Sequence, residues 1–140
     1  MSIKNLFLGL LTVATFFTTV AFTGPAETYT ADVEKSKITW KGYKVTGEHT
    51  GTINLKSANL EMEAGNLTGG SFVIDMASIT CTDLEGKYKG KLEGHLKSAD
   101  FFGVEEHPTA NFKITKVVSR GTPGDYKVVG NLTIKNITKE

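Results

Sequence analysis

The chain has 140 residues, with 16 basic and 15 acidic side chains and a formal net charge of +1. It has no basic stripe interleaved with aromatic residues, which argues against a nucleic-acid partner, and no long charged block of the kind found in disordered tails. Its one cysteine, Cys81, excludes an internal disulfide. The sequence therefore predicts a single modest domain that is stabilised by its hydrophobic core.

The first 26 residues have the features of a secretory signal peptide. Lys4 provides a positive charge, an apolar run extends from Leu6 to Val20, and small residues such as Ala21 and Ala26 follow. We expect cleavage after a position between 21 and 26. The apolar run is shorter than the roughly 20 residues that a membrane-spanning helix needs. The sequence thus predicts an exported protein without a stable membrane anchor, whose domain occupies residues 27–140.

From Tyr29 onward, apolar and polar residues largely alternate, and glycine-rich turns separate the alternating runs. Such a pattern is typical of antiparallel strands that cover a shared interior, and we count about six or seven of them. The predicted interior residues are Ile38, Trp40, Ile53, Leu55, Leu60, Met62, Phe72, Ile74, Met76, Phe112, Ile114, Val128, Leu132 and Ile134. Two interpretations remain open, because a barrel can be filled by its own side chains or can hold one small ligand.

One stretch breaks the alternation and predicts a helix. Its apolar residues recur at every fourth position, as Leu84, Tyr88, Leu92 and Leu96. Thr82 or Asp83 can cap the start of this helix by accepting backbone N–H bonds. Gly86, Gly90 and Gly94 lower its intrinsic stability, so the helix should depend on packing. An extended loop with a short helix near residues 92–97 is the alternative interpretation.

Residues that could carry catalysis or bind a metal do not form a recognised motif. The three histidines, His49, His95 and His107, lack the paired spacing of metal ligands. Cys81 with His95, or Asp75 with Asp83, could be paired in a fold, but their spacing alone is weak support. Cys81 is more simply a small, semi-buried residue at a strand-to-helix turn. We therefore predict no catalytic residues, no metal site, no cofactor and no enzymatic activity.

Several separate segments of the chain resemble the YceI-like family, in the same order. The most specific segment is LEGHLKSADFFGVEEHPTANF, and the others are ITWKGYKVTGEHTGTI, GGSFVIDMASIT and VVGNLTIKNITKE. The resemblance implies an all-β fold, namely an antiparallel lipocalin-like β-barrel with one helix near its opening. Family members continue beyond the last of these segments, so we expect the barrel to be incomplete, with its closing strands missing from a C-terminally truncated chain. Unpaired edges could then support a homodimer.

The resemblance also implies a function, which is the binding and sequestration or transport of an isoprenoid or similar long-chain lipid in the periplasm, with a quinone as one such ligand. It favours a ligand cavity over a filled core. The candidate ligand-binding residues are Trp40, His49, Phe72, Ile74, Met76, Leu92, His95, Leu96, Phe101, Phe102 and Phe112. His49 and His95 would lie near the rim of the barrel, where they could meet a polar head group. The alternative function is a secreted stress or protein-interaction module with a filled core and no lipid ligand.

Overall fold

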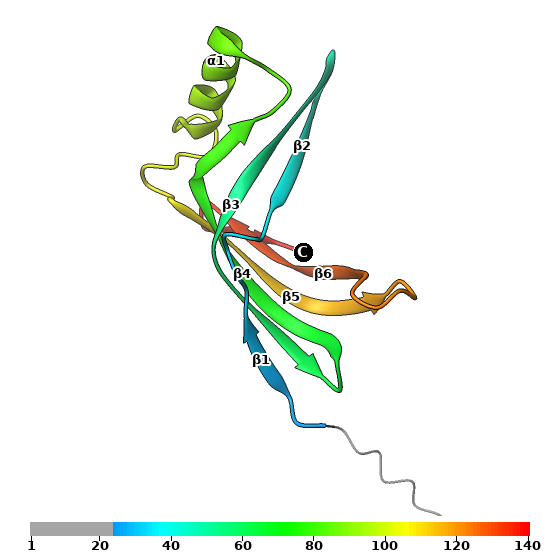
Figure 1. Ribbon diagram of the computed structural model, residues 1–140. Coiled ribbons are helices and arrows are strands. Elements are labelled where there is room, and N and C mark those ends of the chain that lie inside the picture. The colour runs from blue at the N-terminus through cyan, green and yellow to red at the C-terminus, as the bar shows by residue number, and fades with distance from the viewer. Residues whose placement is uncertain (1–23) are drawn as a thin grey trace, which may run out of the picture.

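The computed structural model describes residues 24–140, so the predicted signal peptide lies almost wholly outside the described residues. Strands dominate and one helix interrupts them, which confirms the all-β prediction and the helix near the middle of the chain (Figure 1). The elements in chain order are β1 (Glu27–Thr30), β2 (Ile38–Lys44), β3 (Gly47–Glu63), β4 (Asn66–Cys81), α1 (Gly86–Lys97), β5 (Thr109–Ser119), β6 (Tyr126–Ile134) and β7 (Ile137–Lys139).

The seven strands form one antiparallel sheet in the order β1-β3-β4-β5-β6-β7, with β2 paired to the first part of β3. The sheet is not closed into a barrel within the described residues. β3 and β4 are 17 and 16 residues long and run through the whole molecule. One end of β3 pairs with β2 and the other with β1, so the sheet has an upper part beside α1 and a lower part that carries β1 and the start of β4 (Figure 1).

A bulge in β4 joins these two parts of the sheet. Thr52 of β3 is opposite Thr80 of β4, yet two residues further along β3, Asn54 is already opposite Asp75. The Ser78 hydroxyl donates to the carbonyl oxygen of Asp75 (2.6 Å) and accepts the backbone N–H of Asn54 (2.8 Å). The bulge therefore satisfies the backbone through a side chain, bends the strand, and changes which residues face the interior.

The start of α1 differs from the sequence-based expectation. The helix begins at Gly86, its N-cap residue is Glu85, and no side chain caps it. The predicted cap by Thr82 or Asp83 is wrong, because both side chains bond to β3 instead. The Thr82 hydroxyl donates to the carbonyl oxygen of Thr50 (3.3 Å), and the Asp83 carboxylate accepts the Thr50 backbone N–H (3.0 Å).

Only the C-terminal half of α1 packs against the sheet. Leu96 is the buried residue of the helix and Leu92 is half-buried, whereas Tyr88 is 73% exposed and Leu84 precedes the first turn. The predicted apolar stripe is therefore wrong at its N-terminal end, where the helix extends away from the strands (Figure 1). In the described part of the chain, no helix is long and apolar enough to cross a membrane.

The hydrophobic core lies below the end of α1, where the upper strands meet β5. Its buried residues are Ile53, Met76, Ile79, Leu96 and Ala110. Val128 and Leu132, which were predicted to face the interior, are each 37% exposed. Together with β7 they line an apolar hollow on the face of β6, and this hollow is not part of that core.

Candidate functional site

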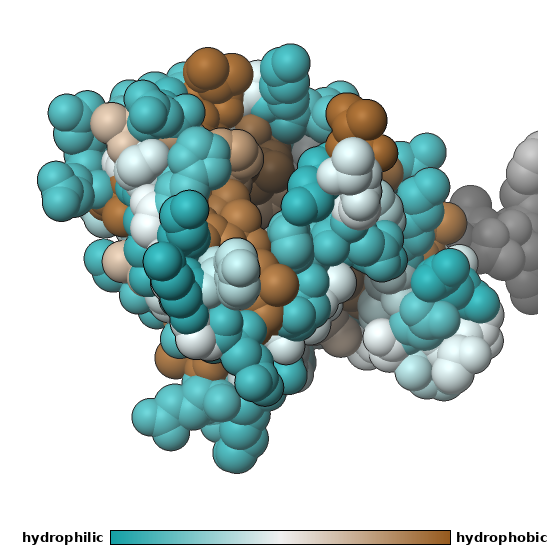
Figure 2. Space-filling model, turned by 90° about the horizontal axis from the view of Figure 1, so that it is seen from above, coloured by the Kyte–Doolittle hydropathy of each residue, from teal (hydrophilic) through white to brown (hydrophobic). Residues whose placement is uncertain are grey.

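An apolar cavity of about 330 Å³ lies between the sheet and the C-terminal end of α1. Viewed from the end that carries α1 and the β2–β3 hairpin, Figure 2 shows apolar side chains within a hollow that hydrophilic side chains surround. The cavity is lined by Ile38, Trp40, Lys41, Gly42, Ile53, Ile74, Met76, Ile79, Leu96, Phe101, Phe102, Ala110 and Ile134. Its volume lies within the range of about 300–1,000 Å³ that is common for small-molecule sites.

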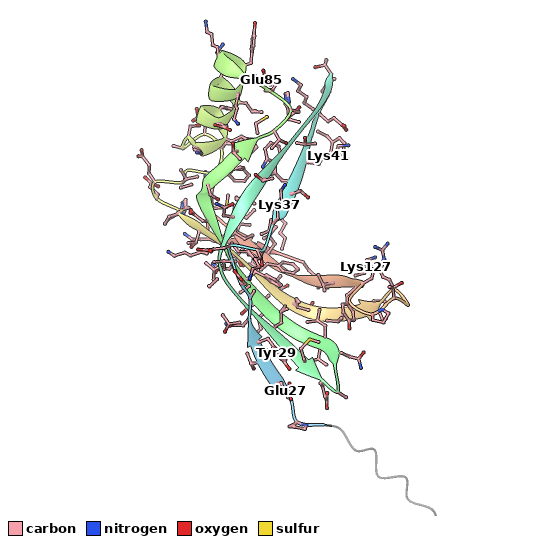
Figure 3. All side chains as sticks on the ribbon, in the orientation of Figure 1. Glu27, Tyr29, Lys37, Lys41, Glu85 and Lys127 are labelled. Carbon is pink, nitrogen blue, oxygen red and sulfur yellow. The ribbon has the colours of Figure 1, made fainter. Side chains whose placement is uncertain are left out.

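The strands present this apolar surface because their alternation places one face of each toward the cavity. Trp40 of β2 contributes the largest side chain, and its single polar atom, Nε1, donates to the carbonyl oxygen of Thr52 (3.3 Å). Lys41 is the one charged lining residue, and its Nζ pairs with Glu48 Oε1 across the β2–β3 hairpin (2.8 Å). Figure 3 places Lys41 on β2 at the upper end of the molecule. The charged group of the lining is therefore already neutralised at the hairpin.

A second hollow of about 190 Å³ adjoins the first and shares Trp40, Gly42, Leu96 and Phe101 with it. The residues that line only this second hollow are Tyr43, Lys44, His49, Leu92 and His95. These residues include one lysine and two histidines. Both hollows are predominantly apolar, and the second one, beside the β2–β3 hairpin, has two imidazole side chains among its lining residues.

The segment after α1 closes one side of the cavity with aromatic rings. The rings of Phe101 and Phe102 meet edge to face at 4.7 Å, and the ring of His95 lies 5.7 Å from that of Phe101. Lys135, from the β6–β7 turn, donates through Nζ to the carbonyl oxygens of Ala99 (3.1 Å) and Phe101 (3.0 Å). The segment is therefore fixed both to the helix and to the opposite end of the sheet.

Glu93 attaches α1 to the end of β4. Its Oε1 accepts the Thr80 hydroxyl (2.6 Å) and the backbone N–H of Cys81 (2.8 Å), and Lys89 Nζ lies 3.8 Å away. The hydrogen bond from Thr80, with that from the Cys81 backbone, lowers the pKa of Glu93 below its ordinary value. A carboxylate that accepts two such hydrogen bonds stabilises the fold more than an exposed ion pair does.

Replacing Glu93 with alanine is expected to lower the free energy of unfolding by about 2 kcal/mol at pH 7, because charge-assisted hydrogen bonds contribute about 1.5–3 kcal/mol. The folded pKa of Glu93 is lower than its ordinary 4.5. Its contribution is therefore complete above that value and is lost as the pH falls through the folded pKa. Urea denaturation at several pH values should show that the difference in free energy of unfolding between the wild type and the variant becomes smaller as the pH falls toward 2. A constant difference across this range would contradict the assignment.

A polar cluster lies at the end of β4, beside the second hollow. The Asp83 carboxylate is 2.9 Å from His49 Nδ1 through Oδ2, and it accepts the Cys81 thiol at 2.9 Å through Oδ1. The bonds from Cys81 and His49 hold the pKa of Asp83 well below its usual range. Burial, with the adjacent carboxylate, raises the pKa of the Cys81 thiol. A protonated thiol is a poor nucleophile, so this arrangement gives no support to covalent catalysis by Cys81.

A family model described as the YceI-like domain matches residues 29–140. The chain belongs to the YceI-like family. Among curated relatives, a UPF0312 protein of Pectobacterium atrosepticum is 47% identical over 45 residues, which are 32% of this chain and 22% of that protein. UPF0312 proteins of Azotobacter vinelandii and Staphylococcus aureus are 33% identical over 78 residues and 40% identical over 76 residues. These matches cover 50% and 54% of this chain but only 40% of each relative.

Most candidate residues of this YceI-like domain lie together beneath the helix. Those that line the first cavity are Trp40, Ile74, Met76, Leu96, Phe101 and Phe102. Those that line only the second hollow are His49, Leu92 and His95. Phe72 and Phe112 lie elsewhere: they pair across β4 and β5 with ring centroids 6.1 Å apart, and Phe112 faces the hollow beside β6 and β7. The structure therefore does not bring Phe72 and Phe112 to the cavity.

The candidate set also omitted residues that line the cavity. Ile79 was not predicted, because the bulge in β4 changes the alternation between Met76 and Ile79. No periodic pattern in the sequence marks such a bulge. Ala110 is too small to stand out as a ligand contact, although it is only 1% exposed. Ile53 and Ile134 were predicted to face the interior, and their place in the lining follows from how the sheet bends.

The two side-chain pairs considered from the sequence, Cys81 with His95 and Asp75 with Asp83, do not form in the structure. In the described part of the chain, the partner of the Cys81 thiol is Asp83, and the His95 ring packs against Phe101 instead of pairing with Cys81. Asp75 is not paired with Asp83, since its Oδ1 accepts the backbone N–H of Ala77 (3.1 Å). Asp75 thus helps to form the bulge in β4.

Proposed function

We propose that this YceI-like domain binds the apolar chain of an isoprenoid or similar long-chain amphiphilic lipid beneath α1, and sequesters or carries it in the periplasm. The observation that supports the proposal is the first cavity, whose lining is apolar except for Lys41 and the backbone of Gly42. A quinone with a prenyl tail is one ligand of this class. The binding requires no covalent step and no cofactor.

The energetic basis of this proposal is the transfer of hydrocarbon out of water. Each methylene group that enters the cavity gains about 0.8 kcal/mol, so a few prenyl units can offset the cost of ordering a flexible chain. A core completely filled by side chains would leave no such space. The volume beneath α1 therefore favours a lipid ligand over the alternative of a protein-interaction module with a filled core.

A polar head group would lie in the second hollow. His49 is partly exposed and His95 is exposed, and both line this hollow beside the apolar rings of Trp40 and Phe101. Imidazole nitrogens can donate to or accept from a quinone carbonyl, a hydroxyl or a phosphate. Placing the head group there lets the chain extend inward to the apolar cavity without burying an unsatisfied polar group.

Replacing Phe101 with aspartate is expected to weaken binding of a prenyl quinone at least tenfold. Phe101 borders both hollows and is 45% exposed, so the new carboxylate can remain hydrated at the mouth without unfolding the domain. A bound apolar chain would have to desolvate that carboxylate, which is costly. Binding can be measured by tryptophan fluorescence, since Trp40 is the single tryptophan and lines both hollows.

The matched control is the change of Val118 to aspartate. Val118 is an apolar residue of β5 with a similar exposure of 41%, and it lines neither hollow. This variant should bind the quinone like the wild type. Native mass spectrometry of the wild type from a periplasmic extract should also detect a co-purifying lipid. Equal binding by both variants, or a wild type that takes up no prenyl lipid, would contradict the proposal and favour the filled-core alternative.

A further inference from the structure

Three different metal-ligating side chains meet where β4 ends. The antiparallel ladder places Gly51 opposite Cys81, and the backbone N–H of Thr82 donates to the carbonyl oxygen of Thr50 (2.9 Å). Continuing this pairing outward brings His49 of β3 beside Asp83, which follows β4. The three side chains are therefore positioned by paired strands, and the backbone N–H of Thr50 fixes the carboxylate at 3.0 Å.

The ligand atoms of these side chains are close enough to share one ion. A ring nitrogen of His49, Cys81 Sγ and an oxygen of Asp83 all lie within 4.8 Å of one another, the only such group among residues 24–140. The two contacts of the carboxylate, to Nδ1 and to Sγ, are both 2.9 Å. Because a carboxylate only accepts hydrogen bonds, each contact holds a proton from the nitrogen or the sulfur. A cation could take the place of those two protons.

We propose that His49, Cys81 and Asp83 bind a zinc ion at this point, beside the second hollow that His49 also lines. Sulfur, imidazole nitrogen and carboxylate oxygen are the ligand types that zinc prefers, whereas magnesium and calcium select oxygen ligands. Cys81 is fully buried, but the side chains of His49 and Asp83 are 21% and 34% exposed. The ion can therefore enter from the solvent side and retain a water molecule as its fourth ligand.

Binding of zinc rearranges the protons of the cluster in a defined way. The Cys81 thiol loses its proton to solvent as the zinc–sulfur bond forms. His49 binds the ion through a ring nitrogen that carries no proton. The Asp83 carboxylate exchanges two hydrogen bonds for one bond to zinc. Zinc binding therefore releases protons and involves no oxidation or reduction.

Cobalt provides the sharpest test of this site, because it replaces zinc and reports its ligands spectroscopically. Metal-free full-length protein titrated with Co²⁺ should develop the near-ultraviolet absorption of a thiolate–cobalt bond, and added Zn²⁺ should abolish it. Cys81 is the only cysteine, so the band has a single source. Wild-type protein that shows no such band at millimolar Co²⁺ would overturn the proposal without any variant.

Substitutions then test which residues hold the ion. Loss of a supporting residue around a metal costs about 10–100-fold in affinity, so the changes Cys81→Ser and His49→Gln should weaken Zn²⁺ binding by at least about 100-fold. The matched control is His107→Gln, which alters a histidine outside the cluster and should leave binding unchanged. Circular dichroism confirms that each variant is folded. Equal Zn²⁺ affinity in the wild type and both cluster variants would contradict the assignment.

Discussion

Replacing Gly51 with alanine is expected to destabilise the domain by about 3 kcal/mol or more. A Cβ atom at Gly51 would lie 2.0 Å from the carbonyl oxygen of Thr80 and 2.4 Å from Cζ2 of Trp40. This oxygen belongs to the backbone of a paired strand and cannot move alone. The indole is held by the hydrogen bond from Trp40 Nε1 to the carbonyl oxygen of Thr52. Overpacking of this kind forces shifts of backbone and side chains that cost about 1–3 kcal/mol and sometimes more. Urea denaturation followed by far-ultraviolet circular dichroism measures the loss.

The same substitution on the helix provides a control of opposite sign. At Gly90 and Gly94, an added Cβ would meet nothing within 4 Å. Because alanine favours the helix over glycine by about 0.8–1 kcal/mol, each change should stabilise the domain modestly. If Gly51→Ala proved as harmless as Gly90→Ala, the close packing of Trp40 against the backbone would be refuted. That packing sets one wall of the cavity, so the experiment also tests the shape of the site.

Replacing Leu96 with alanine is expected to cost about 2–5 kcal/mol of stability and to weaken lipid binding. Leu96 is the buried residue of α1, and it lines both hollows. Its loss removes buried hydrocarbon and leaves a cavity, and a Leu-to-Ala change in a core costs an amount of this size. The two hollows would also merge around the missing side chain, so a bound chain would lose contacts. Urea denaturation and quinone titration measure the two effects separately.

Tyr88→Ala is the control on the same helix. Tyr88 is 73% exposed and lines neither hollow, so its removal should change stability by no more than about 0.5 kcal/mol. Quinone affinity should remain that of the wild type. A loss of stability at Tyr88 as large as that at Leu96 would show that the N-terminal half of α1 packs on a surface. The structure places only its C-terminal half against the sheet.

Local patterns in the sequence determined which segments are strands and which is a helix. The alternation around Ile38, Ile53 and Ile74 is a direct consequence of side chains pointing to opposite faces of a strand. Apolar residues that recur at every fourth position, ending with Leu92 and Leu96, indicated the helix, because residues so spaced share one helical face. The motif-rich segment from Leu92 to Phe112 also indicated the YceI-like family, which the family model confirms.

Long-range geometry decided which residues gather at each site. The bulge at Ser78 brings Ile79 into the cavity, and it depends on a hydrogen bond to Asn54, 24 positions away in the chain. Phe72 has the same alternation as Ile74, but the bend of the sheet places it by Phe112, away from the cavity. Local spacing contains no information about where a long sheet bends.

The cluster at the end of β4 shows most clearly the difference between what local sequence patterns predict and what strand pairing decides. The sequence predicts that Thr82 or Asp83 caps the helix, because both lie just before the apolar residues that recur at every fourth position. The strand register instead brings Asp83 to His49, 34 positions away, and to the Cys81 thiol. The sequence by itself determined the strands, the helix and the family, since those depend on neighbouring residues. Only the tertiary structure decided the cavity lining and the partners of Asp83, since strand pairing brings together residues that are distant in the chain.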